Sequence, residues 1–123
     1  MMNKSNKIKG KVGEDLALAY LLKNGYRLIG RNIRCRLGEI DLVVEDIGSK
    51  QVVIVEVKCK TSDLYGNPWQ MVNYRKMMKL RRLGESFMQG RGDSCVWRID
   101  VVSVTIGESQ KEPTIEHFEN ILE

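Results

Sequence analysis

The sequence predicts an α/β fold in which helices pack against one central mixed sheet. Its segments follow one another as a helix, three strands, a helix and a strand, an order typical of α/β and α+β domains. The chain has 123 residues, 42% of them hydrophobic, which is enough for one core and too few for two. Its 2 prolines and 11 glycines are not concentrated as in collagen-like or low-complexity chains. We therefore expect residues 1–123 to form a single domain that ends in an acidic segment, 107–123.

The first predicted element is a helix over residues 7–24. This segment lacks proline and stops at Asn24–Gly25, and a glycine just past the last turn commonly ends a helix. Short segments rich in Val and Ile then predict three strands, separated by Gly38 and by residues 46–50. The predicted strands are Arg27–Arg34, Glu39–Glu45 and Gln51–Cys59.

The second half of the chain predicts a helix, a strand and a shorter strand. The loop Thr61–Pro68 is rich in turn residues, and Gly90–Arg91–Gly92 ends the helix that follows it. The predicted elements are a helix over Trp69–Gln89, a strand over Val96–Ile106 and a short strand over Thr114–Phe118.

The composition indicates a protein of a reducing cytoplasm. Three widely spaced cysteines (Cys35, Cys59 and Cys95) and a single histidine fit neither a disulfide framework nor a zinc site. The longest apolar run, Leu16–Leu22, is far shorter than the roughly 20 residues that span a bilayer, and no apolar signal region follows the basic start. We expect a soluble cytoplasmic protein with no membrane partner.

The charge is divided unevenly along the chain. The total is +4, and residues 107–123 contribute −4 from five acidic residues and one lysine, so residues 1–106 carry +8. A basic body suits a polyanionic partner, of which nucleic acid is the commonest in a cytoplasm. A plain solvated basic surface explains the same charge equally well.

The second and third predicted strands are expected to form a hairpin. A two-residue type II′ turn at Gly48–Ser49 fits, because glycine suits its first central position, and it pairs residues whose numbers sum to 97. Since side chains alternate between faces, one face is wholly apolar and packs on a helix, while the other carries four ionisable groups. The apolar face holds Ile40, Leu42 and Val44 against Val57, Val55 and Val53. The other face pairs Asp41 with Glu56, Glu39 with Lys58, Val43 with Ile54 and Glu45 with Val52.

Asp41 opposite Glu56 is the unusual feature of this hairpin. Like charges directly opposite each other destabilise a sheet, and burying them without partners costs on the order of several kcal/mol. A cation between them or a raised pKa resolves the conflict. Oxygen ligands with no nearby His or Cys favour Mg²⁺ or Mn²⁺ over zinc. The alternative is an exposed polar end of the sheet with Lys58 as a surface ion-pair partner.

Two charged residues lie among apolar neighbours on the predicted helices. Glu14 stands beside Leu18, and its carboxylate either reaches solvent or points at the acids of the sheet. Lys76 falls in a stripe with Val72 and Leu80, and its ammonium either reaches solvent or points at a phosphate. Both residues are compatible with one cleft that also holds the acids of the hairpin.

At these residues the sequence resembles a known family. The matching blocks are Gly10-x-x-Gly13-Glu14-x-x-Ala17-x-x-Tyr20-Leu21, Gly25-Tyr26, Asn32, Gly38-Glu39-Ile40-Asp41-Leu42, Val55-Glu56-Val57-Lys58, Lys76 and Asp100-Val101-Val102. Over almost the whole chain they are similar to the YraN-type bacterial family. This resemblance implies a likeness to archaeal Holliday-junction resolvases and a restriction-endonuclease-like core (α-β-β-β-α-β), the fold of the PD-(D/E)xK nucleases.

The resemblance also implies which residues form a site. Asp41, followed after fourteen residues by Glu56-x-Lys58, is similar to the metal-binding signature of these nucleases. Glu14 matches the acid on their first helix. Ile40 stands where the name-giving motif has proline, as in many members that lack it. The supporting residues are Glu39 and Gln70, the latter spaced from Tyr74 like a Gln-x₃-Tyr element; Trp69, Gln70 and Tyr74 serve equally well as helix surface.

The expected function is that of a Mg²⁺- or Mn²⁺-dependent endonuclease that hydrolyses phosphodiesters in branched or flapped DNA. Asp41 and Glu56 would hold the metal, Glu14 would complete its shell directly or through water, and Lys58 would orient or activate the attacking water. The expected nucleic-acid contacts are Arg31, Arg34, Arg36, Lys76, Lys79, Arg81 and Arg82.

Two other classes of function fit the same sequence. One is a non-catalytic nucleic-acid-binding module that acts with a partner enzyme. The other is a structural adaptor that dimerises through a sheet edge, in which the acids are ion-pair partners only. A homodimer is compatible with each hypothesis. His117, the single histidine, lies in the acidic segment and is expected to be structural or solvent-facing.

Overall fold

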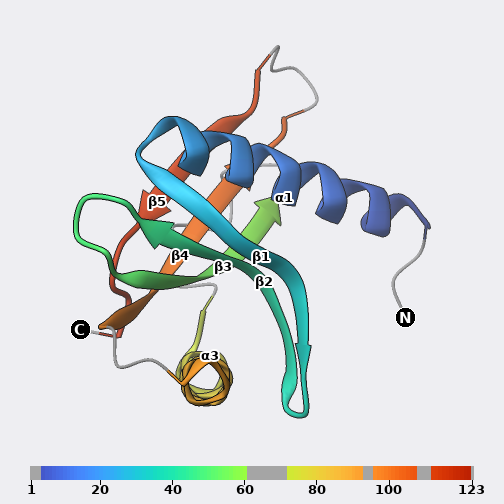
Figure 1. Cartoon of the computed structure of the whole chain (residues 1–123). Coiled ribbons are helices and arrows are strands. Elements are labelled where there is room, and N and C mark those ends of the chain that lie inside the picture. Colours follow the sequence, from blue (N-terminus) through green and yellow to red (C-terminus); the bar gives the residue numbers. More distant parts are fainter. Residues whose placement is uncertain (1–3, 61–71, 93–95, 108–111, 123) are drawn as a thin grey trace.

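The chain folds as one five-stranded mixed sheet with helices packed on it (Figure 1). The computed structural model describes residues 4–60, 72–92, 96–107 and 112–122, with the side chains of the first helix described from residue 10 onward. The strand order is β1-β2-β3-β4-β5, with β3 and β4 parallel and the other neighbours antiparallel. The elements are α1 (Lys4–Lys23), β1 (Tyr26–Cys35), β2 (Gly38–Asp46), β3 (Val52–Lys60), α3 (Tyr74–Arg91), β4 (Trp97–Thr105) and β5 (Thr114–Phe118). The predicted restriction-endonuclease-like order of elements is confirmed.

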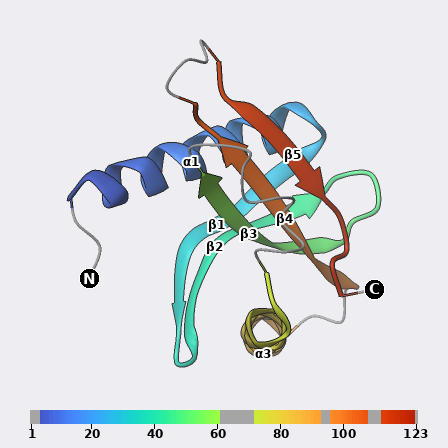
Figure 2. The same ribbon diagram turned by 180° about the vertical axis from the view of Figure 1, so that it is seen from behind.

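Both faces of the sheet are buried, one under α1 and the other under α3 (Figures 1 and 2). Covered strands read as nearly continuous apolar runs, as β3 and β4 do here. The α1 side is built on Ala17, Leu21, Tyr26, Leu42, Val44, Val53, Val55, Val102 and Val104. The α3 side is built on Ile40, Val43, Val52, Ile54, Val72, Leu80, Leu83, Met88, Ile99, Val101 and Ile121.

The second helix begins later than its sequence predicts. Asn73 is the N-cap, and its side-chain oxygen accepts a hydrogen bond from the Lys76 N–H, so Tyr74 is the first helical residue. Val72 is buried before the helix starts, and residues 69–71 lie outside the described part of the chain. At the other end Gly92, with φ of 75°, caps the helix within the expected stop Gly90–Arg91–Gly92, and the last helical residue is Arg91 rather than Gln89.

The turn between β2 and β3 differs from the predicted type II′ turn, although the register is the predicted one. The observed pairs Leu42↔Val55 and Glu45↔Val52 both sum to 97. The connection is wider because the Asp46 carboxylate accepts the N–H groups of Gly48 and Ser49, and Lys50 takes the left-handed conformation, with φ of 65°. The predicted and the observed loop are both centred between residues 48 and 49, so the register is unchanged.

The pairing of β2 with β3 ends at Leu42↔Val55, whereas β1 and β2 stay paired out to Cys35↔Gly38. Residues 33–40 therefore form a two-stranded arm that projects beyond the sheet (Figure 1). Two expectations are corrected here. Glu39 lies opposite Arg34 rather than Lys58, and Ile40 packs on the α3 side rather than with Leu42, because β2 turns away from β3 at this point. The face that carries the acids is also covered, by α3.

His117 is structural. Its side chain is buried on the α1 side, and its Nε2 lies 2.8 Å from Oδ2 of the fully buried Asp100. Arg98 donates to both oxygens of the same carboxylate and to the hydroxyl of Tyr26. Although burial opposes it, these hydrogen bonds from His117 and Arg98 hold the pKa of Asp100 below its usual range. This network ties the C-terminal segment to the body of the sheet.

Two further expectations can be compared with the described residues. Cys35 and Cys59 form no disulfide within the described part of the chain, and Cys95 lies outside it. Among the helices described, none is long and apolar enough to cross a bilayer.

The packing of α3 on β4 makes a testable prediction. A methyl group at Gly84 would collide with the Trp97 ring, whereas one at Gly90, in the same helix, would meet nothing within 4 Å. We expect Gly84→Ala to lower the free energy of unfolding by about 1 to 3 kcal/mol through overpacking. Gly90→Ala is the control and should raise it by about 0.5 to 1 kcal/mol. Urea unfolding measures both, and equal effects would contradict the packing.

Candidate metal centre

Asp41 and Glu56 meet where β2 leaves β3, and we call this place the fork. At this fork the ladder has ended, and the Val57 N–H donates to the Asp41 side chain at 2.9 Å (Oδ2). A carboxylate thus satisfies a main-chain donor that is half-buried within β3. The hydrogen bond fixes Asp41 beside Glu56, the residue that precedes Val57 on the same strand.

Asp41, which is half-buried, and Glu56, which is buried, form a carboxyl pair. Burial, a shared hydrogen bond and the charge of Glu56 together raise the pKa of Asp41 to about 8, against the lowering effect of the Val57 N–H. The charge of Glu14 raises it further. At neutral pH the Asp41 carboxyl group therefore keeps its proton and can donate it to Glu56 in the metal-free protein. The hypothesis of an exposed, polar sheet end is wrong for Glu56, which is only 8% exposed.

Lys76 supplies the nearest positive charge to this pair. Its Nζ lies 3.0 Å from Glu56 Oε2, so the lysine in the apolar stripe of α3 reaches across to the acids. The contact is an ion pair without hydrogen-bond geometry, and Oε2 has no hydrogen-bond partner among the described residues. A buried carboxylate oxygen in this state retains lone pairs that a ligand can use.

Glu14 reaches the fork from α1. The helix comes so close to β3 that a methyl group at Gly13 would lie 2.9 Å from Cys59 Cβ. Glu14 Oε1 accepts a hydrogen bond from the Asn32 amide at 3.1 Å, once that amide is oriented to suit its surroundings. The same amide donates to Glu39 Oε1 at 3.1 Å. Of the two alternatives for Glu14, the one in which it points at the other acids is confirmed.

Arg31 and Glu39 are held by neighbouring side chains. Arg31 donates to Asp15 at 2.8 Å and lies 3.5 Å from Glu14, so this expected nucleic-acid contact is engaged within the protein. Glu39 lies 3.7 Å from the exposed guanidinium of Arg34. These contacts place cations around the rim of the acids.

Lys58 shares the face of Glu56 two residues further along β3. It is half-buried and lies opposite Ser103 in the parallel register with β4. The Ser103 hydroxyl is buried and has no hydrogen-bond partner among the described residues. Lys58 and Ser103 thus bring a cation and a hydroxyl to the side of the carboxyl pair.

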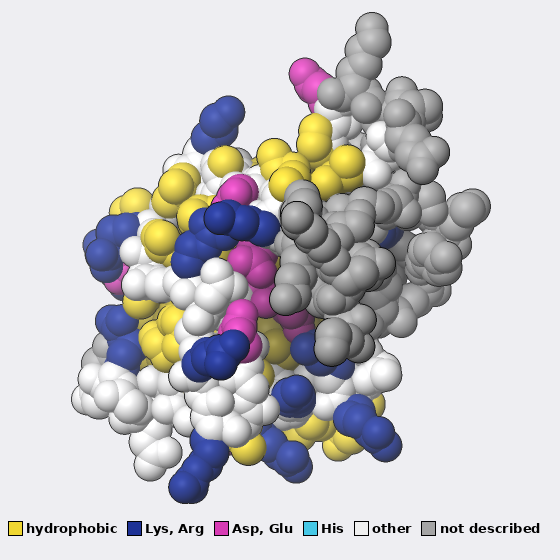
Figure 3. All heavy atoms as spheres, turned by 90° about the vertical axis from the view of Figure 1, so that its right-hand side faces the viewer, with side chains coloured by type: hydrophobic (Ala, Val, Ile, Leu, Met, Phe, Trp, Pro, Cys, Tyr) yellow, Lys and Arg dark blue, Asp and Glu magenta, His cyan; other side chains and the backbone are white. Residues whose placement is uncertain are grey.

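The remaining predicted contacts are exposed on the arm and on α3. Figure 3 shows acidic side chains in the middle of one face, with Lys and Arg on either side of them. Arg81 is paired with Glu85 at 3.0 Å. The exposed cations are Arg34, Arg36, Lys79, Arg81 and Arg82. Gln70 lies outside the described residues, and the side chain of Tyr74 is exposed, with no role at the fork.

Two polar residues at the fork have no assigned role in the sequence analysis. Asn32, quoted only as part of the family resemblance, joins Glu14 to Glu39, and its φ of 51° is unusual for a strand residue. The signal that could have identified Asn32 is its place in the β1–β2 hairpin. It lies between the pairs Arg31↔Leu42 and Ile33↔Ile40, and therefore opposite Asp41. Ser103 is the single hydroxyl in the apolar run Val101–Val104.

The donor set suits a hard divalent cation. Within the described ranges no three His, Cys, Asp or Glu side chains stand as a ready-made metal-binding group. Asp41 and Glu56 are already together, however, with one unbonded buried oxygen and a raised pKa, and Glu14 is close enough to add to that shift. All these donors are oxygens, which favours Mg²⁺ or Mn²⁺. The residues present therefore fit such an ion, with Asp41 and Glu56 as the principal ligands.

Comparison with known proteins identifies relatives along most of the chain. Residues 13–104 match the model of the Uncharacterised protein family UPF0102. A UPF0102 protein of Mycobacterium sp. (strain JLS) is 42% identical over 113 residues, 91% of this chain and 83% of the relative. Those of Pelotomaculum thermopropionicum and Alkaliphilus oremlandii are 38% and 40% identical over 120 and 118 residues, 97% and 94% of this chain and 98% and 97% of each relative. The matched region contains every described residue of the fork.

The raised pKa of Asp41 predicts how stability depends on pH. The folded state keeps a proton that the unfolded chain loses near pH 4, so stability should fall as pH rises from about 4 to about 8. Asp41→Asn removes this ionisation. In EDTA we expect the variant to be more stable than the wild type at pH 9 by a few kcal/mol, since one pKa unit is about 1.4 kcal/mol, with little gain at pH 5.

Thermal melting at several pH values, with and without Mg²⁺ or Mn²⁺, measures this. The metals should stabilise the wild type and leave Asp41→Asn unchanged. Glu45→Gln is the control, because Glu45 lies on the same strand but pairs with the exposed Arg27. A variant that melts lower in EDTA at pH 9, or that responds to metal as the wild type does, would contradict a shared metal site.

Proposed function

The chain belongs to the UPF0102 family, and we propose that it is a metal-dependent nuclease of the PD-(D/E)xK type that hydrolyses phosphodiester bonds in branched or flapped DNA. The observation that carries the proposal is the Asp41–Glu56 pair, in which a half-buried and a buried carboxyl group are held together and Glu56 Oε2 contacts only the Lys76 ammonium among the described residues. Two buried carboxyl groups held in contact lower the stability of a fold unless a ligand uses them. A site that retains such a conflict is more often functional than structural.

The chemistry is the addition of water to a phosphodiester. A P–O bond forms to the water oxygen and the P–O bond to one sugar oxygen breaks; the water gives up a proton to solvent, and the departing sugar oxygen takes a proton from solvent and becomes a hydroxyl. A divalent cation held by Asp41 and Glu56 would supply charge neutralisation at the phosphate oxygens. The carboxylates orient the centre, and Lys58 acts on the reacting atoms.

Glu14 and Asp41 are the residues that orient the centre. Glu14 completes the ligand set directly or through water, since α1 already brings it within electrostatic reach of Asp41. The hydrogen bond from Val57 restricts the Asp41 carboxylate to one position, and that restriction lowers the reorganisation needed on ligand binding.

Lys58 is the residue proposed to act on the reacting atoms. It follows Glu56 by two positions on one face of β3, and a cation cannot itself ligate a metal ion. Its ammonium is suited to hold the attacking water or to offset the charge that develops on the phosphate.

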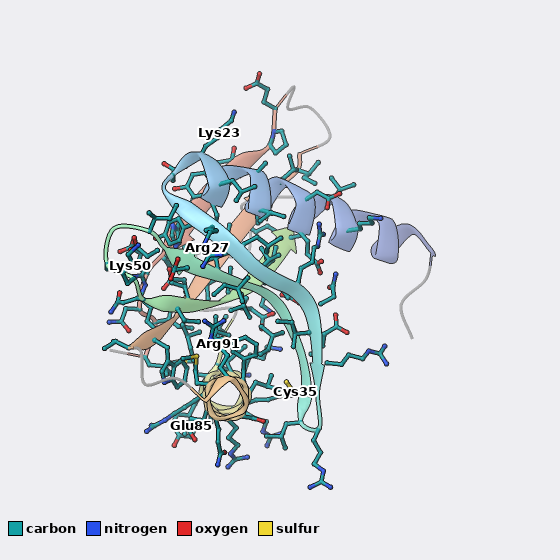
Figure 4. The ribbon with its side chains drawn as sticks, in the orientation of Figure 1. Lys23, Arg27, Cys35, Lys50, Glu85 and Arg91 are labelled. Carbon is teal, nitrogen blue, oxygen red and sulfur yellow. The ribbon has the colours of Figure 1, made fainter. Side chains whose placement is uncertain are left out.

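The preference for branched DNA rests on the resemblance to Holliday-junction resolvases, and the arm gives it physical support. The arm carries the exposed cations Arg34 and Arg36 beyond the edge of the sheet, next to the fork. Figure 4 labels Cys35 on this arm, far from Lys23 at the end of α1. A projecting cationic hairpin suits contact with phosphates on either side of a branch.

A non-catalytic binding module is the second candidate. It is favoured by the lack of a ready-made three-ligand group among the described residues. In that case the same basic surface binds nucleic acid, and a partner enzyme performs the cleavage.

Lys58→Ala separates the two candidates. With Mn²⁺, the wild type should nick a four-way junction or a flap, and the variant should lose about tenfold to thousandfold in kcat, or about 1.4 to 4 kcal/mol, while metal and DNA affinities stay unchanged. Lys23→Ala removes the same charge far from the fork and is the control. If the purified wild type cuts no branched, flapped or single-stranded nucleic acid with Mg²⁺, Mn²⁺ or Co²⁺, the nuclease proposal is wrong and the binding module is the remaining candidate.

The salt dependence of DNA binding tests the arm. Backbone-driven affinity should fall steeply with salt, and Arg34→Ala should reduce the slope of log K against log salt by about one unit for each phosphate that the variant no longer neutralises. Lys23→Ala should leave the slope unchanged. Fluorescence anisotropy with a labelled junction measures both, and binding that is independent of salt would argue against a nucleic-acid function of either kind.

A further inference from the structure

We propose that Lys76 is an exchangeable counter-ion: it neutralises Glu56 in the metal-free protein and moves to the DNA backbone when a divalent cation binds. This inference rests on the proposed function and adds to it a coupling between metal binding and DNA binding. The observation behind it is the 3.0 Å contact between Lys76 Nζ and Glu56 Oε2.

The contact is close but not locked. The Glu56 side chain is 10% exposed and that of Lys76 35%, so one end of the pair is buried and the other opens to solvent. The ion pair is the one contact of Oε2 among the described residues, because that oxygen has no further hydrogen-bond partner there. A cation with a stronger preference for carboxylate oxygen can displace it.

The position of Lys76 in its helix makes a second, independent argument. Its N–H is bonded to the N-cap Asn73 at 2.9 Å, so the residue belongs to the first turn of α3. The N-terminal end of a helix repels cations, by about 0.3 to 1 kcal/mol. A nearby anion stabilises a lysine placed there, and the fork offers Glu56 in the absence of ligand and a phosphate in its presence.

Charge balance decides which anion Lys76 faces. Glu14, Asp41 and Glu56 converge on the fork, where Lys76 lies 3.0 Å from Glu56 and Arg31, shared with Asp15, lies 3.5 Å from Glu14. A divalent cation neutralises the ionised Asp41–Glu56 pair by itself and repels the ammonium. Lys76 is then free to bind a phosphate beside the metal. Metal binding therefore raises DNA affinity through Lys76, and DNA raises metal affinity by the same factor.

Mn²⁺ titration by calorimetry tests the first half of the exchange. Lys76→Met removes the competing ammonium, and we expect it to bind Mn²⁺ about tenfold more tightly than the wild type. Arg75→Met is the matched control: Arg75 is an exposed cation in the same turn, and its removal should change the Mn²⁺ affinity by less than about twofold. Lys76→Arg keeps the charge and should bind Mn²⁺ more weakly than Lys76→Met. Thermal melting confirms that each variant is folded.

DNA binding tests the second half. In EDTA, Lys76→Met and the wild type should bind a junction equally, because Glu56 holds the ammonium; with Ca²⁺ in place of EDTA, the variant should bind about fivefold to tenfold more weakly. An unchanged or weaker Mn²⁺ affinity in Lys76→Met, or a DNA defect of equal size with and without metal, would overturn the exchange. Absence of Mn²⁺ binding in all proteins would overturn the metal centre as well. The expected Mn²⁺ difference without any cleavage by the wild type would overturn only the nuclease.

Discussion

The hydrogen bond from the Val57 N–H to the Asp41 carboxylate occurs where a main-chain carbonyl of β2 would otherwise be the acceptor. It allows β2 to leave β3 without exposing an unsatisfied donor inside the sheet. The opening that results lets side chains from α1 and α3 meet at one point. The arm, the carboxyl pair and the access of both helices all depend on this hydrogen bond, in which the Asp41 side chain takes the place of a main-chain acceptor.

The fork imposes an electrostatic problem that the surrounding elements partly solve. Burial keeps the carboxyl groups from water, so their charge must be offset by a proton, a cation or a hydrogen-bond donor. The Asn32 amide donates a hydrogen bond to Glu14, and the Lys76 ammonium pairs with Glu56. The raised pKa of Asp41 keeps its carboxyl group protonated at neutral pH. The two side-chain partners come from different elements, Asn32 from β1 and Lys76 from α3.

The sequence predicts the fold and the register well, because a period-two apolar pattern places every strand residue on one face or the other. It fails where a side chain replaces a backbone interaction. Asp46 widens the predicted turn, Asn73 delays the helix, and Ile40 changes face once β2 has left its partner. For the fork, spacing brings Asp41 and Glu56 together, but the partner of Lys76 depends on how α3 docks, which no local pattern contains.

The hydrogen bond of the Val57 amide to a side chain has a consequence for spectroscopy. Most amides of a central strand are held by carbonyl groups, whose acceptor strength is constant, whereas this one is held by a group that can gain a proton or a ligand. The resonance frequency of the Val57 amide and its rate of hydrogen exchange with solvent must therefore change when the Asp41 carboxyl group gains or loses a proton or a ligand. A single backbone signal thus reports the state of the fork from within the sheet, in a protein that carries no chemical probe.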